Sequence, residues 1–436
     1  MLLSIDELAR AVGGVVHGET ETCHGLAIDS REVRGGELFA AVVAERDGHD
    51  FIPSALAAGA AAWLGSHPVD AEGTWIEVAD TAAALLDVGR LARTKLPERV
   101  VAVTGSVGKT TVKDLTASAL ATRWRAHANE RSFNNELGVP ITLANAPDDA
   151  EAVVVEMGAR GRGHVRLLCD VAQPTVGVVT VVALAHAEMF GTIESVAIAK
   201  GELVEALPRS GTAVLNADDP LVAAMAPRTA ASVLRYGVAS PADVTADGVA
   251  LDDDLRPRFR LHSPWGSADV HLVVSGAHQV GNALAAAAAA LASDVPVDDI
   301  AAGLANATLS PWRMALARTP AGAVVLNDAY NANPTSLAAA LHSLAAVDAR
   351  RRVAVLGVMA ELGDHAEVEH RRIASLADEL GIAVIAVDTD AYGVAPVDGI
   401  EGALLALGAV GEGDAVLVKG SRVAGLERLA LHLTDR

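Results

Sequence analysis

The sequence predicts an α/β protein of three domains. These are a central doubly wound, mainly parallel sheet with a phosphate-binding loop, a C-terminal Rossmann-like α/β domain and a small mixed α/β N-terminal domain. Strand-like apolar runs alternate with helical segments through the middle and last parts of the chain. Hydrophobic residues make up 51% of the chain but aromatic residues only 3%, which suits helices packed on sheets of small aliphatic side chains. Joints near Pro97 and Pro311 interrupt the alternation and divide the chain.

The predicted domains are residues 1–97, 98–310 and 311–436. The first mixes short strands, such as ELFAAVV, with helices such as FIPSALAAGAAAWL. A chain of 436 residues is long enough for each segment to have a core of its own. We therefore expect the first domain to be small and mixed in structure.

The central segment opens with the strand RVVAVTG, and a helix is expected to begin at Lys109. Further strands are expected at AVVVEMG, TVGVVTVV and TAVLNADD. Strands that alternate with helices favour a parallel sheet with helices on both faces. From DVTADG to HLVV the pattern becomes that of hairpins, which predicts a small antiparallel annex with LDDDL as a solvated turn.

The last segment alternates again and predicts a second nucleotide-binding-like α/β domain. Helices are expected from Thr335 and through Leu380, and a last helix follows the final strand. The expected strands are GAVVLNDAY, RRVAVLG, IAVIAV and DAVLVKG.

Charge and composition exclude some classes of function. A net charge of -21 argues against a general nucleic-acid-binding protein, because phosphate backbones require a basic surface. It leaves room for a small anionic ligand in a local pocket. Cys23 and Cys169 form neither a metal-binding spacing nor a disulfide framework, so we expect free thiols in a reducing cytoplasm. The N-terminus MLLSIDELARAVGG contains acids where a signal peptide needs an apolar core, and no apolar run is long enough for a membrane span. We expect a soluble, cytoplasmic protein.

The segment AVTGSVGKTTVKDL predicts a phosphate-binding loop. Its small residues allow backbone N–H groups to approach phosphate oxygens, the helix N-terminus adds partial positive charge, and Lys109 can reach the terminal phosphates. Thr110 is placed to ligate magnesium. Val103 stands where the full Walker pattern has its first glycine, so a structural glycine-rich turn remains an alternative. The predicted nucleotide-binding residues of this segment are Gly105, Ser106, Gly108, Lys109, Thr110 and Thr111.

Two further side chains follow strands of the same predicted sheet. Glu156 ends the strand of VVVEMG, and His186 lies just past TVGVVTVV. The carboxyl ends of parallel strands meet at one edge, so both should lie near Thr110 and could serve a hard cation. A structural salt bridge for Glu156 and a hydrogen-bonded loop position for His186 are the alternatives.

Lys200 is expected to point inward. In IESVAIAKGELVEAL it falls within the apolar stripe formed by Val196, Leu203 and Val204, whereas Glu202 lies on the opposite face and Ile198 faces the polar side. A lone buried ammonium costs several kcal/mol, so it must pair, reach solvent or change its chemistry.

Six segments together resemble the ATP-dependent Mur ligase family, enzymes that build the peptide stem of peptidoglycan. They are, in chain order, TGSVGKTT, SFNNELGVP, VVEMGA, AHAEMFGTIESVAIAKGE, VLNADDP and GAHQVGNALAAAA. The resemblance implies ATP as co-substrate, Mg2+, and carbamylation of Lys200 by carbon dioxide, which turns the amine into an anion with two oxygens. It implies catalytic roles for Lys109, Lys200 and His186. The implied metal ligands are Thr110, Glu156, His186 and Lys200.

The C-terminal segments narrow the expected reaction. NDAYNANPTSLAAAL, LGVMAELGDHAEVEHRRI and VLVKGSR resemble the family member that joins D-alanyl-D-alanine to UDP-N-acetylmuramoyl-tripeptide through an acyl phosphate. The segment DSREVRGGELFAAVVAERDGHDFIPSALAAGA resembles the uridine-nucleotide-binding domain of such enzymes. The resemblance thus implies an ATP-dependent ligase that forms a C–N bond between small-molecule substrates, and we expect a monomer.

The same resemblance implies roles for residues outside the phosphate loop. Asn282 is expected at the adenine, Arg313 at the phosphates and Asp328 at the ribose. Because these residues come from two domains, we expect the third domain to close over the second. The expected substrate-binding residues are Ser30, Arg31, Asp47, Gly48 and His49 for the uridine nucleotide, Asn134 and Asn135 between nucleotide and peptide, and Tyr330, Asn331 and Asn333 for the dipeptide.

The chain departs from the family pattern at three places. Val107 replaces the usual asparagine, EMGARGRGHV lacks an Asn-His pair after the alanine, and VVALAHAEMFG lacks a Gly-Pro pair. None of the changes removes a charged catalytic group. Two other functions stay open at this point: a Mur-type ligase that adds a different amino acid, and a phosphate-loop ATPase that turns over ATP without an acyl acceptor.

Overall fold

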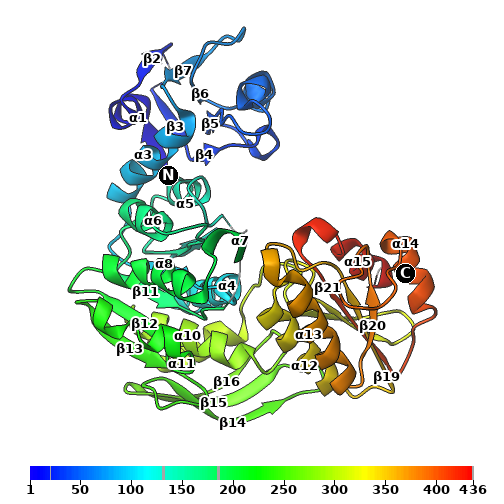
Figure 1. The fold of residues 1–436 in the computed structure, drawn as a ribbon. Helices are drawn as coiled ribbons and strands as arrows, with labels where there is room; N and C mark the ends of the chain where they lie inside the picture. Colours follow the sequence, from blue (N-terminus) through cyan, green and yellow to red (C-terminus); the bar gives the residue numbers. More distant parts are fainter. Residues whose placement is uncertain (20, 130–132, 184–186, 435–436) are drawn as a thin grey trace.

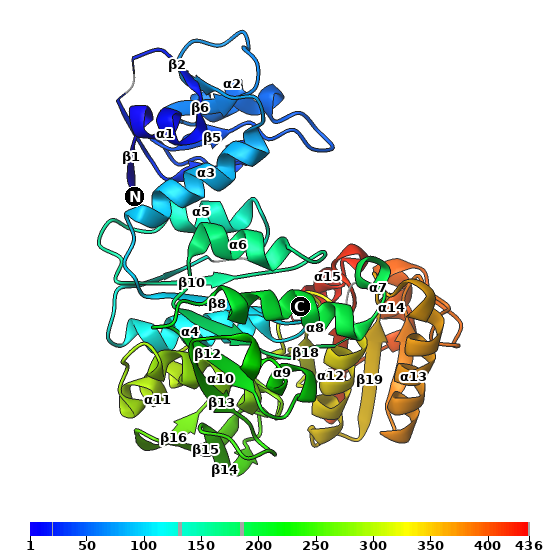
Figure 2. The same ribbon diagram turned by 60° about the vertical axis from the view of Figure 1, so that its left-hand side comes forward.

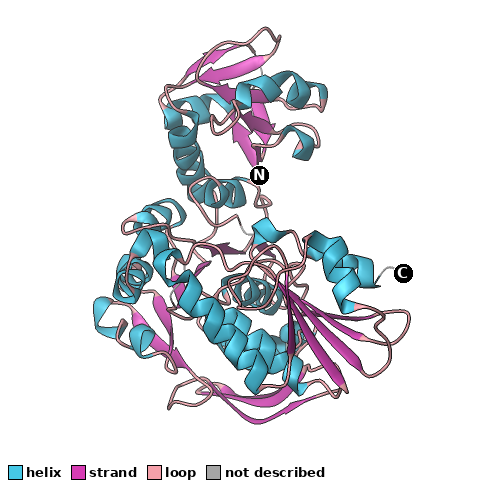
Figure 3. Cartoon of the chain, turned by 45° about the vertical axis from the view of Figure 1, so that its right-hand side comes forward, coloured by secondary structure: helices cyan, strands magenta, loops and turns pink. Residues whose placement is uncertain are grey.

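The computed structural model describes residues 1–19, 21–129, 133–183 and 187–434. Three parts are visible in Figure 1: an N-terminal part at the top, a central part below it, and a C-terminal part beside the central one. Their sheets form separate groups of strands in Figure 3. The predicted α/β fold class is confirmed. No helix in the described part of the chain combines the length and hydropathy that crossing a membrane requires.

The N-terminal part contains a five-stranded mixed sheet of order β2-β7-β6-β5-β4. Strands β4 to β7 are parallel and β2 is antiparallel to β7. The strands are β2 (Val15–His17), β4 (Leu26–Ala27), β5 (Leu38–Ala40), β6 (Ala62–Gly65) and β7 (Thr74–Glu77), and a separate pair is formed by β1 (Leu2–Ser4) and β3 (Thr22–His24). The helices are α1 (Ile5–Val12), α2 (Ile52–Ala57) and α3 (Thr81–Thr94).

The N-terminal part is joined to the central part by packing and hydrogen bonds. Helix α3 packs on α5 (Gly138–Ala144) and α6 (His164–Ala172), and one apolar core runs through both parts. The Asn145 amide exchanges two hydrogen bonds with the backbone of Leu26, of 2.7 and 2.9 Å. Arg93 donates to the carbonyl of Ala172 at 2.8 Å. These contacts fix the first sheet against the second.

The central sheet has six parallel strands in the order β13-β12-β11-β8-β10-β9. The chain places β9 and β10 on one side of β8 and then β11, β12 and β13 on the other. The carboxyl end of β8 therefore lies where the strand order reverses, and open α/β sheets bind ligands at such points. Every residue of β8 is buried, as expected for a strand covered on both faces. The strands are β8 (Val100–Thr104), β9 (Ala126–Ala128), β10 (Ala152–Glu156), β11 (Val176–Val179), β12 (Thr212–Asn216) and β13 (Ser232–Tyr236).

Helices cover both faces of this sheet (Figure 2). One face carries α4 (Lys109–Ala121), α10 (Gln279–Leu291) and α11 (Val297–Ala305), and the other carries α5, α6 and α8 (Ile193–Ala206). The predicted helix start at Lys109 is confirmed. The short helices α7 (Ala187–Phe190) and α9 (Pro220–Ala223) flank α8.

The predicted antiparallel annex is also confirmed. It is a three-stranded sheet of order β14-β15-β16, and β16 packs on α11. The strands are β14 (Thr245–Leu251), β15 (Pro257–Ser263) and β16 (Gly266–His271). Within LDDDL, Asp252 accepts hydrogen bonds from the backbone of Asp254 and Arg256, so this acid shapes the turn. Asp254 pairs with Arg318 at 3.0 Å and ties the annex to the C-terminal part.

The C-terminal sheet has the order β17-β18-β21-β19-β20, with β17 antiparallel to β18 and the other pairs parallel. The strands are β17 (Ala315–Arg318), β18 (Val324–Asn327), β19 (Arg351–Leu356), β20 (Ala383–Ala386) and β21 (Asp414–Lys419). The helices are α12 (Pro334–Ala346), α13 (Ala366–Glu379), α14 (Gly399–Leu407) and α15 (Glu427–Thr434). Helix α12 begins one residue before the predicted Thr335, because a proline fits the first helical position.

Candidate active site

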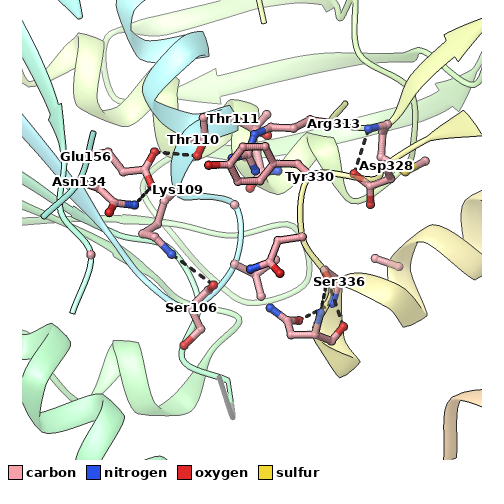
Figure 4. A pocket seen from close by; sticks show the side chains of 18 of the residues that line it. Ser106, Lys109, Thr110, Thr111, Asn134, Glu156, Arg313, Asp328, Tyr330 and Ser336 are labelled. Atoms are coloured by element: carbon pink, nitrogen blue, oxygen red, sulfur yellow. Dashed lines mark hydrogen bonds between the residues drawn. The ribbon is translucent and has the colours of Figure 1, made fainter. Parts of the chain in front are cut away.

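A cavity of about 330 Å3 lies between the carboxyl edge of the central sheet and the C-terminal part. Figure 4 shows side chains from both parts directed toward it. The phosphate loop, the end of β10, helix α8 and the start of α10 line it from one side. Several residues between 313 and 339, together with Lys419, line it from the other. The cavity therefore joins segments that are hundreds of residues apart.

The loop after β8 has the backbone of a phosphate-binding turn. Gly105 and Gly108 both have positive φ, of 147° and 85°. A Cβ on Gly105 would come within 2.0 Å of the Thr180 hydroxyl, and one on Gly108 within 2.5 Å of the Asn282 amide oxygen. Only glycine fits at these positions. Lys109 folds back over the loop and donates to the carbonyl of Gly105 at 2.9 Å.

Glu156 forms a buried polar centre at the end of β10. One carboxylate oxygen accepts from the Thr110 hydroxyl at 2.7 Å and the other from the Asn134 amide at 2.7 Å. Burial is the largest influence on the carboxyl group and acts to raise its pKa, but the charges of Lys109 and Arg313 and the two hydrogen bonds hold the pKa of Glu156 below its usual range. An anionic carboxylate and a hydroxyl thus meet beside the loop.

Lys200 lines the same cavity and is only 3% exposed, as its helical position predicts. Burial and, next, the positive charge of Lys109 lower the pKa of the Lys200 amine well below its usual range, against the opposite influence of Glu156 and Glu202. Within the described residues, the Lys200 amine makes no hydrogen bond or ion pair. The amine is therefore biased toward its neutral form, which is the nucleophilic one.

Glu202, which was expected on the face of α8 opposite the apolar stripe, is buried against helix α6. Glu202 is 8% exposed, and its carboxylate accepts from the backbone N–H groups of Gly163 at 2.6 Å and Arg166 at 3.0 Å. The first N–H groups of a helix have no intrahelical acceptor. Glu202 satisfies those of α6 and so links this helix to the helix that carries Lys200. Ile198 is 40% exposed, as predicted.

The C-terminal part contributes a second group of charged side chains to the cavity, which includes Asp328 and Lys419. Asp328 accepts from the Lys419 ammonium at 2.5 Å and from the backbone N–H of Met314 at 3.1 Å. Lys419 also donates to the carbonyl of Asn331 at 2.8 Å. The Arg313 guanidinium lies over the ring of Tyr330, 4.0 Å from its centroid (Figure 4). These contacts hold the segment from Arg313 to Asn331 against the end of β21.

The predicted amide side chains of Asn333, Asn135 and Asn282 have structural partners. Asn333 caps α12 by accepting from Ser336 N–H at 2.9 Å, within a reciprocal capping box. Asn135 accepts from the backbone of Gly138 at 2.9 Å at the start of α5. Asn282 donates to the Gln279 side chain at 2.7 Å and abuts the phosphate loop at Gly108. All three side chains still line the cavity.

The predicted uridine-nucleotide residues lie elsewhere, at the carboxyl edge of the N-terminal sheet. Ser30 and Arg31 follow β4, and Asp47, Gly48 and His49 follow β5. His49 is 3% exposed; its ring nitrogens contact Asp47 Oδ1 at 2.6 Å and the backbone N–H of Ser66 at 2.9 Å. The His49 ring thus positions the Asp47–Gly48 turn against β6.

The structure also shows cavity residues that the sequence left unassigned. They are Arg160, His164, His278 and Lys419, and Glu136 contacts the first two. Predicted residue His186 lies outside the described residues. Cys23 and Cys169 are free and buried, as expected, and burial raises the pKa of each thiol to about 12.

Models of three domains match the chain. They are "Mur ligase family, catalytic domain" at residues 22–95, "Mur ligase middle domain" at residues 103–290 and "Mur ligase, glutamate ligase domain" at residues 312–422. The chain belongs to the Mur ligase family, and it is a ligase.

Within the family, two similar curated proteins carry the name UDP-N-acetylmuramoyl-tripeptide–D-alanyl-D-alanine ligase. The protein from Mycobacterium tuberculosis is 39% identical over 99% of this chain and 90% of its own length. The protein from Escherichia coli is 34% identical over 99% of this chain and 98% of its own length.

Solved structures agree with this similarity. A crystal structure of MurF from Acinetobacter baumannii has a TM-score of 0.90 at 29% identity, and the match covers 100% of this chain and 99% of that one. MurF ligase from Thermotoga maritima, solved in complex with ADP, has a TM-score of 0.81 at 27% identity, with 93% of this chain and 96% of that one covered.

Proposed function

We propose that this chain joins D-alanyl-D-alanine to UDP-N-acetylmuramoyl-tripeptide in an ATP-dependent reaction of peptidoglycan precursor synthesis. The observation that carries the proposal is the cavity between two domains. On one side it is lined by the phosphate loop, the anionic Glu156 and the inward Lys200, and on the other by the segment of Tyr330 and Asn331. Near-full-length similarity to ligases named for this reaction supports the choice of substrates.

The chemistry explains why ATP is needed. A carboxylate is a poor acyl donor because its leaving group would be oxide. The terminal carboxylate of the tripeptide therefore attacks the γ-phosphorus, which forms an acyl phosphate and releases ADP. The amine of D-alanyl-D-alanine attacks the acyl carbon, loses a proton, and phosphate leaves as the amide forms. Two anions meet in the first step, so the protein mainly positions groups and neutralises charge.

Lys109 and the loop N–H groups would hold the terminal phosphates in this proposal. Asn282 would contact the adenine from the central domain, whereas Arg313 and Asp328 would contact phosphate and ribose from the C-terminal domain. Because the two sets of residues line one cavity, nucleotide binding should draw the two domains together. In this proposal residues 1–97 bind the uridine nucleotide and residues 98–310 bind ATP. Residues 311–436 close over the ATP-binding domain.

The residues present fit a magnesium ion. Thr110 and Glu156 lie within 2.7 Å of each other and offer the oxygen ligands that a hard cation prefers, and Glu156 is anionic. When bound, the ion would neutralise phosphate charge. The low pKa of Lys200 supports its carbamylation, since only a neutral amine adds carbon dioxide. Carbamylated Lys200 and His186 complete the proposed ligand set.

The peptide and uridine ends have separate sites in this proposal. Ser30, Arg31, Asp47 and Gly48 would bind the uridine nucleotide, with His49 holding their loop. Asn134 and Asn135 would lie between nucleotide and peptide. Tyr330, Asn331 and Asn333 would lie near the dipeptide.

Phosphate release tests the proposed function. With ATP, Mg2+ and UDP-N-acetylmuramoyl-tripeptide, release should depend on D-alanyl-D-alanine and stop when EDTA removes the metal. Release that ignores the dipeptide would identify an ATPase instead. Release that requires another amino acid would identify a different ligase of the family.

A further inference from the structure

A compact group of three charged or titratable side chains lies beside the proposed reaction centre. It consists of Glu136, Arg160 and His164, and we refer to it as the Glu136 cluster. One oxygen of Glu136 accepts from Arg160 NH1 at 3.1 Å, and the other contacts His164 Nε2 at 3.0 Å. The backbone N–H of Arg160 points at His164 Nδ1, 3.2 Å away. His164 Nδ1 is thus the acceptor, and Nε2 carries the hydrogen that Glu136 receives.

The Glu136 cluster is anchored to the elements that carry Glu156 and Lys200. Arg160 follows Glu156 by four residues, and Glu136 follows Asn134, the amide partner of Glu156. His164 begins helix α6, whose N-terminus is held by Glu202 of the Lys200 helix. Arg160 and His164 line the same cavity as Glu156 and Lys200. The hydrogen bonds Asn134–Glu156 and Gly163–Glu202 therefore link the Glu136 cluster to the elements that carry the proposed reacting groups.

Arg160 keeps hydrogen-bonding capacity toward the cavity. Its side chain is 57% exposed, compared with 32% for Glu136 and 15% for His164. A guanidinium has five N–H donors, and only NH1 of Arg160 has a recorded side-chain partner among the described residues. The remaining edge has the planar, two-donor geometry that matches a carboxylate. Glu136 fixes the orientation of this edge in advance.

The substrate named for one similar protein has carboxylates that Arg160 could bind. The protein from Acinetobacter baumannii is named for UDP-N-acetylmuramoylalanyl-D-glutamyl-2,6-diaminopimelate. Glutamate and diaminopimelate each have two carboxyl groups. One glutamyl carboxyl is used in the bond to diaminopimelate, and one carboxyl of diaminopimelate reacts with ATP. Such a tripeptide thus brings two carboxylates that do not react.

We infer that Arg160, oriented by Glu136 and His164, binds a non-reacting carboxylate of the tripeptide substrate and so selects a peptide with a second acid near its reacting end. This inference rests on the proposed function. It assigns a role to the segment ARGRGH, which departs from the family pattern and which the proposed mechanism leaves unused. Arg160 contributes substrate affinity, whereas Glu136 and His164 are positioning residues.

The first test compares Arg160→Ala with Arg162→Ala. Arg162 lies in the same loop, is exposed and does not line the cavity, so it is the matched control. For a tripeptide with both free carboxylates, Arg160→Ala should raise the KM for the nucleotide substrate about tenfold, since a charge-assisted bidentate contact is lost. The KM values for ATP and D-alanyl-D-alanine, kcat and the Arg162→Ala kinetics should stay the same. An unchanged KM in Arg160→Ala would overturn the inference.

Two altered substrates identify the carboxylate. One has lysine in place of diaminopimelate, and the other has the glutamyl carboxylate converted to an amide. In the wild-type protein one of these substrates should show the tenfold higher KM, and Arg160→Ala should cause no further loss with that substrate. If Arg160→Ala raises the KM equally for all three substrates, Arg160 does not contact either carboxylate and the inference fails.

Glu136→Gln separates positioning of the charge from shaping of the loop. The substitution keeps the side-chain shape but weakens the charged contact that orients Arg160, so the KM for the nucleotide substrate should rise about two- to threefold. A rise as large as that in Arg160→Ala would overturn the inference in favour of a structural role. If the wild-type protein shows no dipeptide-dependent phosphate release, the proposed function itself is overturned. Failure of the inference and failure of the proposed function can therefore be distinguished.

Discussion

Two buried lysines face the cavity from opposite domains, and their surroundings differ. Lys419 of the C-terminal sheet is 2% exposed and has a carboxylate partner, Asp328, and a carbonyl partner, Asn331. Lys200 of the central domain is 3% exposed, and within the described residues no partner of its amine is recorded. The two lysines are thus almost equally buried but differ in whether the amine has a carboxylate partner. The fold gives Lys419 a carboxylate partner, whereas burial lowers the pKa of the Lys200 amine and favours its nucleophilic form.

The difference has a thermodynamic consequence with a definite sign. Burial lowers the pKa of Lys200 in the folded protein, whereas the unfolded chain has the ordinary lysine pKa. Below that ordinary value the unfolded state binds more protons, so Lys200 destabilises the fold at neutral pH, and the penalty disappears as the pH rises through the ordinary lysine range. Lys419 differs in its contacts, because it pairs with Asp328, and its removal would leave that carboxylate without its cation.

The largest expected effect is the loss of activity in Lys200→Ala. We expect dipeptide-dependent phosphate release to fall at least a thousandfold, because the proposed carbamate and its charge disappear. Short-chain carboxylic acids should restore part of the activity by placing a carboxylate in the vacated space. Steady-state phosphate release with and without acetate or propionate measures both effects. Full activity in the variant would contradict the proposed role.

The next largest effect is a loss of stability in Lys419→Met. Removing one partner of a buried ion pair leaves the other uncompensated, and the free energy of unfolding should fall by about 3–5 kcal/mol. The KM for ATP should rise as well, since Lys419 holds Asp328 in place. Denaturant titration and ATP kinetics measure the two effects. In Lys419→Met/Asp328→Asn the loss of stability should be smaller, because no carboxylate is left without its cation; an equal or larger loss would contradict the pairing.

A smaller effect of opposite sign is expected for Lys200→Met. This variant should be more stable than the wild-type protein at pH 7, because a desolvated amine is replaced by an apolar side chain of similar length. The gain should shrink as the pH approaches 10, where the unfolded chain also loses the proton. Denaturant titrations of both proteins at pH 7 and 10, in carbon dioxide-free buffer without metal, measure the difference. A gain that grows with pH would contradict the lowered pKa.

The comparison also shows which features a sequence can predict. The phosphate loop and the inward position of Lys200 depend on residues a few positions apart, so helical and strand periodicity is sufficient to predict them. The partner of Lys419 lies 91 residues away, and the helix that Glu202 caps begins 38 residues earlier, at His164. No local pattern contains such pairings. Buried Lys113 donates to the carbonyl of Asn129, 16 residues away, so this contact has no local signal either.

Some missed features did have a local signal. Asn333 is followed by proline and, three positions on, by Ser336, which is the pattern of a capped helix start. That pattern predicts the structural part of its role, whereas the resemblance predicted only contact with the dipeptide. The position of Glu136 beside Arg160 had no such signal, since it depends on how two loops of the central sheet meet.

The smallest effect is expected for Ile198→Glu, two residues before Lys200 on the same helix. Ile198 is 40% exposed, and the recorded contact of this residue is made by its carbonyl, which accepts from Arg228. A change on this outer face should alter the free energy of unfolding by no more than about 0.5 kcal/mol and leave phosphate release unchanged. Denaturant titration and the phosphate assay measure this. If Ile198→Glu loses activity as Lys200→Ala does, the helix as a whole is sensitive to substitution, rather than the inward amine alone. The contrast between Lys200 and Lys419 would then no longer explain the loss of activity in Lys200→Ala.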